Sequence, residues 1–342
     1  MSMTQILFLR GSRDQRQGIL RQVILWWLVL GFPFSWHKAQ LDKKVEWIGA
    51  SIRIDPQQKV VAMGIPKEKT DKFLKAVWDA MASPVVPRKD LENMAGLVEW
   101  MAGILPQLKP FNTMLWAALG RKAKNIFSKQ IAVTLEWFQA FAENRKIGNE
   151  RIFRLTPPRF TIMVAFDAST TGGGAVMWQV PVERSPQAGN MATILSMCPT
   201  QYTFWRWELH HQQWAQARCH DSGSQARWEA LALVLAVATW KDQLLANRGQ
   251  WCFLGDPLGV LQGAVNFRSK DAAINRLFME LALMVVESGG ELRAEHLWSE
   301  HNGIADELRR LHEGAALPEI LHQVPQVVGG QPQWNIIPAL SG

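Results

Sequence analysis

Residues 160–176 read FTIMVAFDASTTGGGAV, and this stretch decides the fold. The apolar run predicts a buried strand from Phe160 to Asp167, so that Asp167 ends the strand. The three glycines at 172–174 predict a turn that tolerates positive φ, and residues 175–180 then predict the returning strand. The stretch therefore predicts an antiparallel pair with a carboxylate at the end of the sheet, although an ordinary turn aspartate explains Asp167 equally well.

Three further acids follow Asp167 at comparable places in predicted elements. Glu229 lies in the first turn of an apolar helix over 226–240, Asp256 follows a short strand over 250–254, and Asp306 lies early in a helix over 303–311. Each has an ordinary explanation: a charge at a helix N-terminus, a helix cap, or a solvated helix face. Their order along alternating strands and helices lets one sheet bring all four acids together.

Four carboxylates at one place repel each other unless they share cations. Carboxylate oxygens prefer hard divalent ions, so the four acids predict a pair of Mg²⁺ sites, which Mn²⁺ could also fill. Two such ions are typical of phosphoryl-transfer chemistry. The acids therefore point to hydrolysis of phosphodiester bonds.

The second half reads as β-β-(β)-α-β-α-β-α, in which the third strand is expected near 192–197 and an insertion near 201–222. In the first half, residues 45–54 and 59–63 predict a hairpin, and helical spacing recurs in several segments. The helices expected there cover 14–30, 67–81, 91–100, 111–119 and 131–144. The fold class is therefore α/β.

The motifs AFDAS (165–169), EALA (229–232), GD (255–256) and NGIADEL (302–308), together with the glycines at 172–174, resemble the ribonuclease H domain of retroelement reverse transcriptases. The resemblance covers about residues 160–312, and the sequence is similar in particular to the DIRS-like group of these elements. It implies a ribonuclease H-like mixed sheet flanked by helices. It also implies a mostly helical thumb and connection region before the sheet, with a small β-hairpin.

The first half supports this resemblance. Residues 30–40 and 45–49 resemble the end of a polymerase palm, whereas 65–69 and 91–98 resemble thumb and connection helices. The implied division is a palm remnant (1–64), a helical thumb and connection (65–150), a ribonuclease H-like domain (151–312) and a tail (313–342). The polymerase motif Tyr-x-Asp-Asp is absent, since the only tyrosine is Tyr202, so polymerase activity is not expected from this chain.

The resemblance implies cleavage of the RNA strand of RNA–DNA hybrids by two-metal hydrolysis. Asp167, Glu229, Asp256 and Asp306 would be catalytic and metal-binding, His301 and Asn302 auxiliary, and Ser169, Lys67, Lys122 and Lys124 would contact nucleic acid. A solvated face explains the lysines and His301 just as simply. A catalytically silent module that binds nucleic acid or another protein is the alternative, and an integrase-like nuclease acting on DNA is a third reading.

Composition sets the outer limits. The chain has 342 residues, a formal charge of +7 and three cysteines without a CxxC pair, which favours a reducing, intracellular compartment. The apolar run at 23–36 is too short to span a bilayer and is expected to form a buried helix, so no membrane partner is expected. The 17 tryptophans are explained first by filling of the core, and the alternative is that some of them form surfaces on which bases or sugars stack. Expected partners are a hybrid or another nucleic acid, and other retroelement proteins.

Overall fold

The computed structural model divides into two compact units, residues 1–67 with 150–155, and residues 68–149 with 156–342. The predicted four-part division stays a prediction. The structure describes residues 7, 9–32, 36, 39–40, 42–121, 123–143, 150–155, 160–180, 195–246, 251–288, 292–329 and 334.

The first unit contains a four-stranded antiparallel sheet in the order β1-β2-β3-β6. The strands are β1 (Lys44–Trp47), β2 (Ala50–Asp55), β3 (Val60–Gly64) and β6 (Glu150–Arg154). The expected hairpin is present, but its first arm is split, because Ile48 and Gly49 adopt positive φ between β1 and β2. Glu150, at the start of β6, forms an ion pair of 3.2 Å with Arg53 of β2.

Helix α1 (Arg13–Val29) does not bury its apolar side. The helix is present where it was expected, with a capping box between Ser12 and Gln15, but none of its residues is buried. Leu25, Trp26 and Val29 are largely exposed. The expectation of a buried helix is therefore wrong, since local capping forms the helix and tertiary burial does not contribute. Among the described residues, no helix has the length and apolar content that crossing a bilayer requires.

The second unit begins with a helical bundle that agrees with the expected helices. It contains α2 (Lys67–Ala82), α3 (Arg88–Ile104), α4 (Lys109–Gly120) and α5 (Ala132–Glu143), with a two-stranded sheet of β4 (Val85–Pro87) and β5 (Asn125–Phe127). Aromatic side chains fill its core: Phe73 meets Phe138 edge-on at 5.2 Å, and Phe111 stacks on Trp137 at 5.0 Å.

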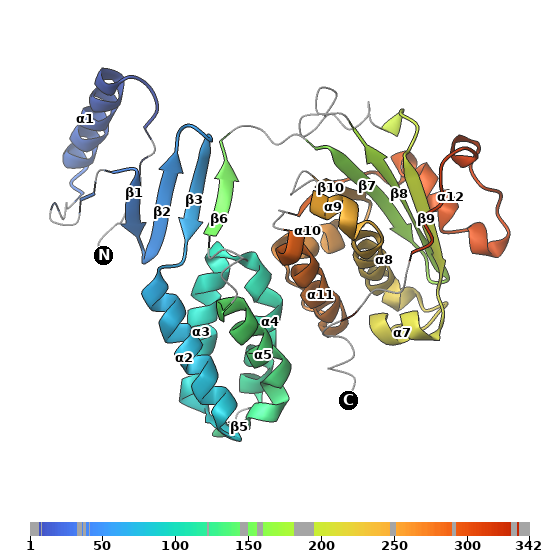
Figure 1. Ribbon diagram of the computed structural model, residues 1–342, viewed down its shortest axis with the longest axis horizontal. Coiled ribbons are helices and arrows are strands. Elements are labelled where there is room, and N and C mark those ends of the chain that lie inside the picture. The colour runs from blue at the N-terminus through green and yellow to red at the C-terminus, as the bar shows by residue number, and fades with distance from the viewer. Residues whose placement is uncertain are drawn as a thin grey trace. The chain divides into compact units, whose positions relative to one another are not determined.

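The rest of the second unit is built on a five-stranded mixed sheet in the order β11-β10-β7-β8-β9 (Figure 1). Strands β7, β8 and β9 are antiparallel neighbours, whereas β10 and β11 run parallel to β7. The strands are β7 (Ile162–Ala168), β8 (Gly172–Gln179), β9 (Gln201–Arg206), β10 (Trp251–Gly255) and β11 (Arg293–His296). The fold is therefore mixed α/β, as expected.

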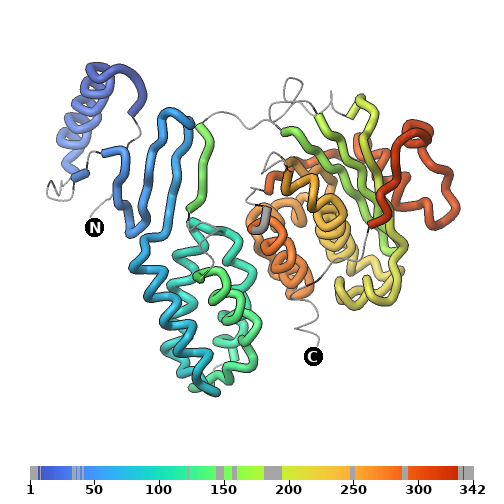
Figure 2. The backbone as a smooth tube through the Cα atoms, viewed as in Figure 1, coloured from blue at the N-terminus to red at the C-terminus, as the bar shows by residue number. Residues whose placement is uncertain are grey.

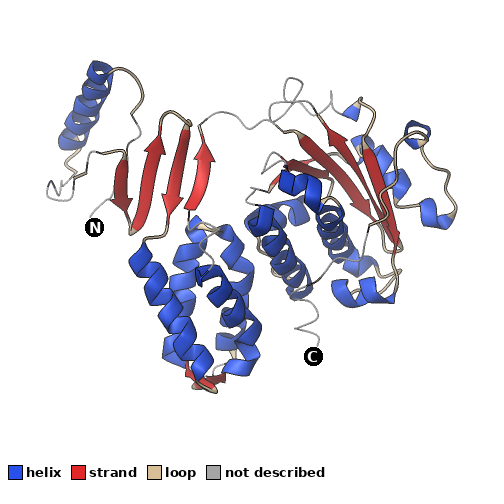
Figure 3. Ribbon diagram, in the orientation of Figure 1, coloured by secondary structure: helices blue, strands red, loops and turns tan. Residues whose placement is uncertain are grey.

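Helices follow the strands in the expected alternation (Figures 2 and 3). The helices are α7 (Leu209–Ala215), α8 (Gln225–Thr239), α9 (Lys241–Ala246), α10 (Leu258–Asn266), α11 (Ala272–Ser288) and α12 (Gly303–Leu308). Helices α8 and α12 each pack against β7 and β8. Leu321 and Val324, from the residues assigned to a tail, are buried in the core of the sheet, and Tyr202 forms a bridge with Gln326.

The third strand lies elsewhere than expected. Residues 192–194 fall outside the described residues, and 195–197 are not a strand. The strand is β9, within the stretch that was expected to be an insertion. Its sequence QYTFWR combines β-branched and aromatic residues, which favour a strand, and Tyr202, Thr203 and Trp205 are buried. The histidines and tryptophans just after it hid this signal.

The glycines at 172–174 form the start of β8, and none of them has positive φ. The expected turn is therefore wrong, and close packing explains the glycines instead. A Cβ on Gly172 would meet His312 at 2.3 Å, one on Gly173 would meet Trp207 at 2.6 Å, and one on Gly174 would meet Leu308 at 2.5 Å. Because side chains alternate along a strand, α8 and α12 cover opposite faces of the sheet: Trp207 stacks on Trp228 of α8, whereas Leu308 belongs to α12.

We expect Gly174→Ala to lower the free energy of unfolding by about 1–3 kcal/mol, as overpacking of a tight core does. The added Cβ would also lie 2.9 Å from the backbone nitrogen of Arg309, which a side-chain rotation cannot relieve. Chemical denaturation measures the change. Gly96→Ala is the matched control, because nothing lies within 4 Å of its Cβ in α3 and alanine favours a helix. Equal stability of the two variants would contradict the close packing.

Candidate functional site

Asp167 lies near the end of β7, opposite Gly174 on β8. Its side chain is only 16% exposed. Burial raises the pKa of this carboxyl group to about 6, which the guanidinium of Arg309 partly opposes, while the charges of Asp306 and Asp256 raise it further. The strand end therefore holds a buried carboxylate with two other acids close enough to affect its charge.

Glu229 projects from the second turn of α8. Burial raises the pKa of its carboxyl group to about 7, and the charges of Asp167 and Asp256 add to this shift. Gln225, one turn earlier, donates to the carboxylate at 3.1 Å and to the carbonyl of Ala168 at 2.7 Å. The same amide thus ties Glu229 to the end of the strand that bears Asp167.

Asp256 follows β10 directly and does not cap the next helix, because α10 starts after Pro257 without a side-chain cap. Its carboxylate receives a hydrogen bond from the Ser299 hydroxyl at 2.5 Å and lies 3.2 Å from Nε2 of His296. His296 ends β11 and Ser299 follows it, so the neighbouring parallel strand positions this acid.

Asp306 lies in the first turn of α12 and meets Asp167 through one guanidinium. Arg309 Nε lies 2.8 Å from Asp167 Oδ2 and 2.8 Å from Asp306 Oδ1. The same group donates to the carbonyl of Ala168 at 3.2 Å. Arg310, more exposed, lies 2.9 Å from Asp306 Oδ2. The structure therefore brings the four acids to one end of the sheet, with Arg309 between two of them.

The donor set suits a hard divalent cation, since every group is a carboxylate and two of them are destabilised in the charged form by burial and mutual repulsion. The arrangement does not hold one as it stands. Within the part of the chain that the structure describes, no three His, Cys, Asp or Glu side chains form a group that could hold a metal ion. Arg309 supplies the positive charge at the place where a cation would meet Asp167 and Asp306.

The auxiliary residues behave differently from one another. Asn302 is buried and donates to the carbonyl of Phe166 at 3.0 Å, so it joins the start of α12 to β7. His301 is 60% exposed and lies 3.7 Å from Glu300, an acid outside the four. The Ser169 hydroxyl accepts from the backbone N–H groups of Thr171 and Gly172 and thereby closes the turn before β8.

Of the expected nucleic-acid contacts, Lys67 and Lys124 are exposed, and Lys122 lies outside the described residues. Lys67 belongs to the first unit and Lys124 to the second. Sequence reasoning missed Arg309, His296, Ser299 and Gln225. Two of them had a signal, because Arg309 follows Asp306 by three residues and Gln225 precedes Glu229 by four, spacings at which side chains meet on a helix.

No family model matches the chain, and no curated protein matches it. Among solved structures, three of a foamy viral protease–reverse transcriptase are similar. The complex with an RNA/DNA hybrid is 14% identical with a TM-score of 0.36, covering 96% of this chain and 37% of that chain. The dRH form in complex with ds DNA is 13% identical with a TM-score of 0.32, covering 84% of this chain and 44% of that chain. The complex with dsDNA is 13% identical with a TM-score of 0.33, covering 85% of this chain and 53% of that chain. The chain thus spans about half or less of their length, and a likeness this weak supports no conclusion.

We expect Arg309→Gln to lower the free energy of unfolding by about 1–3 kcal/mol, because it removes charged hydrogen bonds from two poorly exposed carboxylates. Arg310→Gln is the matched control: it contacts the same Asp306 but is 54% exposed, and exposed ion pairs contribute about 0–1 kcal/mol. Denaturation in the presence of a chelator measures both. A larger loss for Arg310→Gln would contradict the central place of Arg309.

Glu229 should make stability fall as the pH rises. The folded carboxyl group keeps its proton up to about pH 7, whereas the unfolded group releases it near 4.5, so the folded state holds more protons in this window. The contribution of the Glu229 carboxyl group to stability is full below its unfolded pKa of 4.5 and is lost as the pH rises through its folded pKa of about 7. Glu229→Gln should therefore gain stability relative to the parent as the pH rises from about 4.5 to about 7. Denaturation at several pH values in a chelator measures this. Glu307→Gln, at an exposed position of α12, controls for the lost charge, and an equal response of both variants would contradict the burial effect.

Proposed function

We propose that the part of the chain over residues 160–312 hydrolyses the RNA strand of RNA–DNA hybrids, as a ribonuclease H-type enzyme derived from a retroelement reverse transcriptase. The observation that supports this most is the meeting of Asp167, Glu229, Asp256 and Asp306 at one end of a mixed sheet. The mixed sheet with helices packed on it supports the proposal too, since a mixed sheet flanked by helices is what the sequence resemblance implies.

The four acids would hold two Mg²⁺ ions, which Mn²⁺ could replace. Such ions activate a water molecule and stabilise the charge on the scissile phosphate and the leaving oxygen. The chain itself must first release Asp167 and Asp306 from Arg309. Ser299 and His296 keep Asp256 oriented throughout, and Gln225 keeps Glu229 beside β7.

The raised pKa values of Asp167 and Glu229 have a consequence for this release. The pKa values of about 6 and about 7 bring proton uptake and release by these two carboxyl groups closer to neutral pH than is usual for carboxyl groups, so arriving positive charge can displace a proton from the cluster. When Arg309 leaves, the loss of its positive charge favours uptake of a proton by Asp167, and an arriving cation would displace that proton. The acids therefore have two ways of limiting their mutual repulsion, a guanidinium and a proton.

Nucleic acid would be recognised through its backbone and duplex shape. Exposed Lys124, Lys67 and the turn at Ser169 are proposed contacts, with His301 assisting departure of the product. Polymerase activity is not part of the proposal, because the sequence has no Tyr-x-Asp-Asp motif. Association with other retroelement proteins is proposed on the resemblance alone.

The second candidate is a catalytically silent module that binds nucleic acid or another protein. The contacts of Arg309 favour it, because a guanidinium that neutralises Asp167 and Asp306 makes the acid cluster stable without a metal ion. The two candidates differ in whether a divalent ion can displace that arginine.

The proposed activity predicts that purified protein cleaves a labelled RNA–DNA hybrid when Mg²⁺ is added. Asp167→Asn should abolish this cleavage, a loss of at least about a hundredfold, because it removes the acid that interacts electrostatically with each of the other three. Gel analysis of the labelled strand measures the rate. Asp79→Asn, at an exposed position of α2, is the matched control and should cleave like the parent.

The other results separate the candidates. Hybrid binding without cleavage, in parent and variant alike, would support the silent module. Cutting of duplex DNA but not of hybrid would point to an integrase-like nuclease. Cleavage that persists in Asp167→Asn would come from a contaminant and would overturn the assignment of the site.

A further inference from the structure

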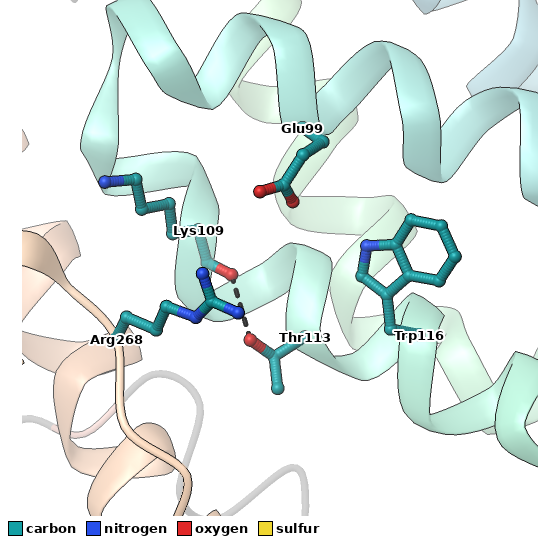
Figure 4. A pocket seen from close by; sticks show the side chains of 5 residues that line it. All are labelled: Glu99, Lys109, Thr113, Trp116 and Arg268. Carbon is teal, nitrogen blue, oxygen red and sulfur yellow. Dashed lines mark hydrogen bonds between the residues drawn. The ribbon is translucent and has the colours of Figure 1, made fainter.

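A polar pocket of about 300 Å³ lies in the second unit, and none of the four acids lines it. It is lined by Glu99, Lys109, Thr113, Trp116 and Arg268 (Figure 4). Glu99 comes from α3, the next three residues from α4, and Arg268 from the segment after α10. The volume is at the small end of the range for ligand pockets, enough for a mononucleotide.

The helices that form the pocket are fixed to each other. Asn275 at the start of α11 donates to the carbonyl of Pro110 on α4 at 2.9 Å, and this hydrogen bond is buried. The segment that bears Arg268 is held in turn, since the Arg268 N–H donates to the carbonyl of Gly263 at 2.9 Å. Phe267 ends α10 in the left-handed conformation and directs the chain towards α11. The pocket is therefore a preformed feature of this unit.

The two ends of the pocket differ in chemistry. Trp116 forms one end, and its indole is 47% exposed, although the largest fully buried side chains of this chain include four other tryptophans. Lys109 lies at the opposite end, with Arg268 between it and Trp116 (Figure 4). An exposed aromatic face beside two cationic groups suits a ligand with a planar ring at one end and an anion at the other.

Glu99 adds selectivity for the ring. Its carboxylate points into the pocket and receives a hydrogen bond of 2.7 Å from the amide of Asn112, which is 1% exposed. A carboxylate only accepts hydrogen bonds, so it selects a ring edge that carries N–H donors. It also repels an anion, which leaves the phosphate to the end with Lys109 and Arg268. Guanine presents adjacent N–H donors on one edge, and adenine presents fewer.

We propose that this pocket binds a purine nucleotide, guanine in preference to adenine, with the base on Trp116 and Glu99 and the phosphate at Arg268 and Lys109. The nucleotide is either free or the unpaired end of a strand, since the chemistry is the same. The proposal does not rest on the nuclease function, because none of its residues belongs to the acid cluster.

Equilibrium dialysis with labelled guanosine monophosphate in a chelator tests the proposal without any cleavage. The parent should bind it saturably, and adenosine monophosphate more weakly. Trp116→Leu should weaken binding about tenfold or more, as loss of a base-stacking surface does. Trp78→Leu is the matched control, because Trp78 is 48% exposed on α2 but lies outside the pocket, and it should bind like the parent.

Two further variants test the ends separately. Arg268→Gln should weaken the binding of guanosine monophosphate but leave the binding of guanosine unchanged. Glu99→Gln should reduce the preference for guanine over adenine. A duplex with one unpaired guanosine, compared with the blunt duplex, shows whether the natural source is a strand end or a free nucleotide. Absence of saturable binding to every probe, or equal loss in Trp116→Leu and Trp78→Leu, would overturn the proposal. Circular dichroism melting confirms that each variant is folded.

Discussion

The arrangement of the second unit depends on the repulsion between buried carboxylates and on the guanidinium that opposes it. Asp167 comes from β7 and Asp306 from α12, and burial raises the pKa of the Asp167 carboxyl group. Arg309 contacts both, and it also reaches the carbonyl of Ala168, so charge and backbone are satisfied by one side chain. This contact offsets the repulsion where the strand end and the helix approach each other.

The close approach has a second requirement, which is steric. Helix α12 lies so near β8 that Leu308 leaves no room for a Cβ on Gly174, and Trp207 does the same to Gly173 on the opposite face. The glycines thus let α12 approach until Arg309 can reach Asp167. Electrostatic and packing constraints therefore act on the same pair of elements, and a change in either one displaces the other.

The sequence allowed the element order and the four acids to be predicted, because apolar runs and helical spacing are local signals. The helix expected over 226–240 is α8 (Gln225–Thr239), which differs by one residue at each end, and the strand expected over 160–167 is β7 (Ile162–Ala168), which starts two residues later. The position of β9 was missed because its aromatic residues continue into a stretch rich in His and Trp. The exposed α1 was missed because amphipathic spacing does not say whether a partner surface exists. The spacing of Arg309 three residues after Asp306 was a local signal for that one ion pair, but its contact with Asp167 could not be predicted, since the two residues are far apart in the sequence.

The contact between Arg309 and the carbonyl of Ala168 joins residues that are 141 positions apart. During synthesis, β7 leaves the ribosome long before α12 exists, so the acids of the first strand and of α8 must wait in water without their arginine. The sheet can form early from β7, β8 and β9, which are adjacent along the chain. Closure of the acid cluster therefore depends on a contact between residues far apart in the sequence, which forms later than the local pairing of β7, β8 and β9.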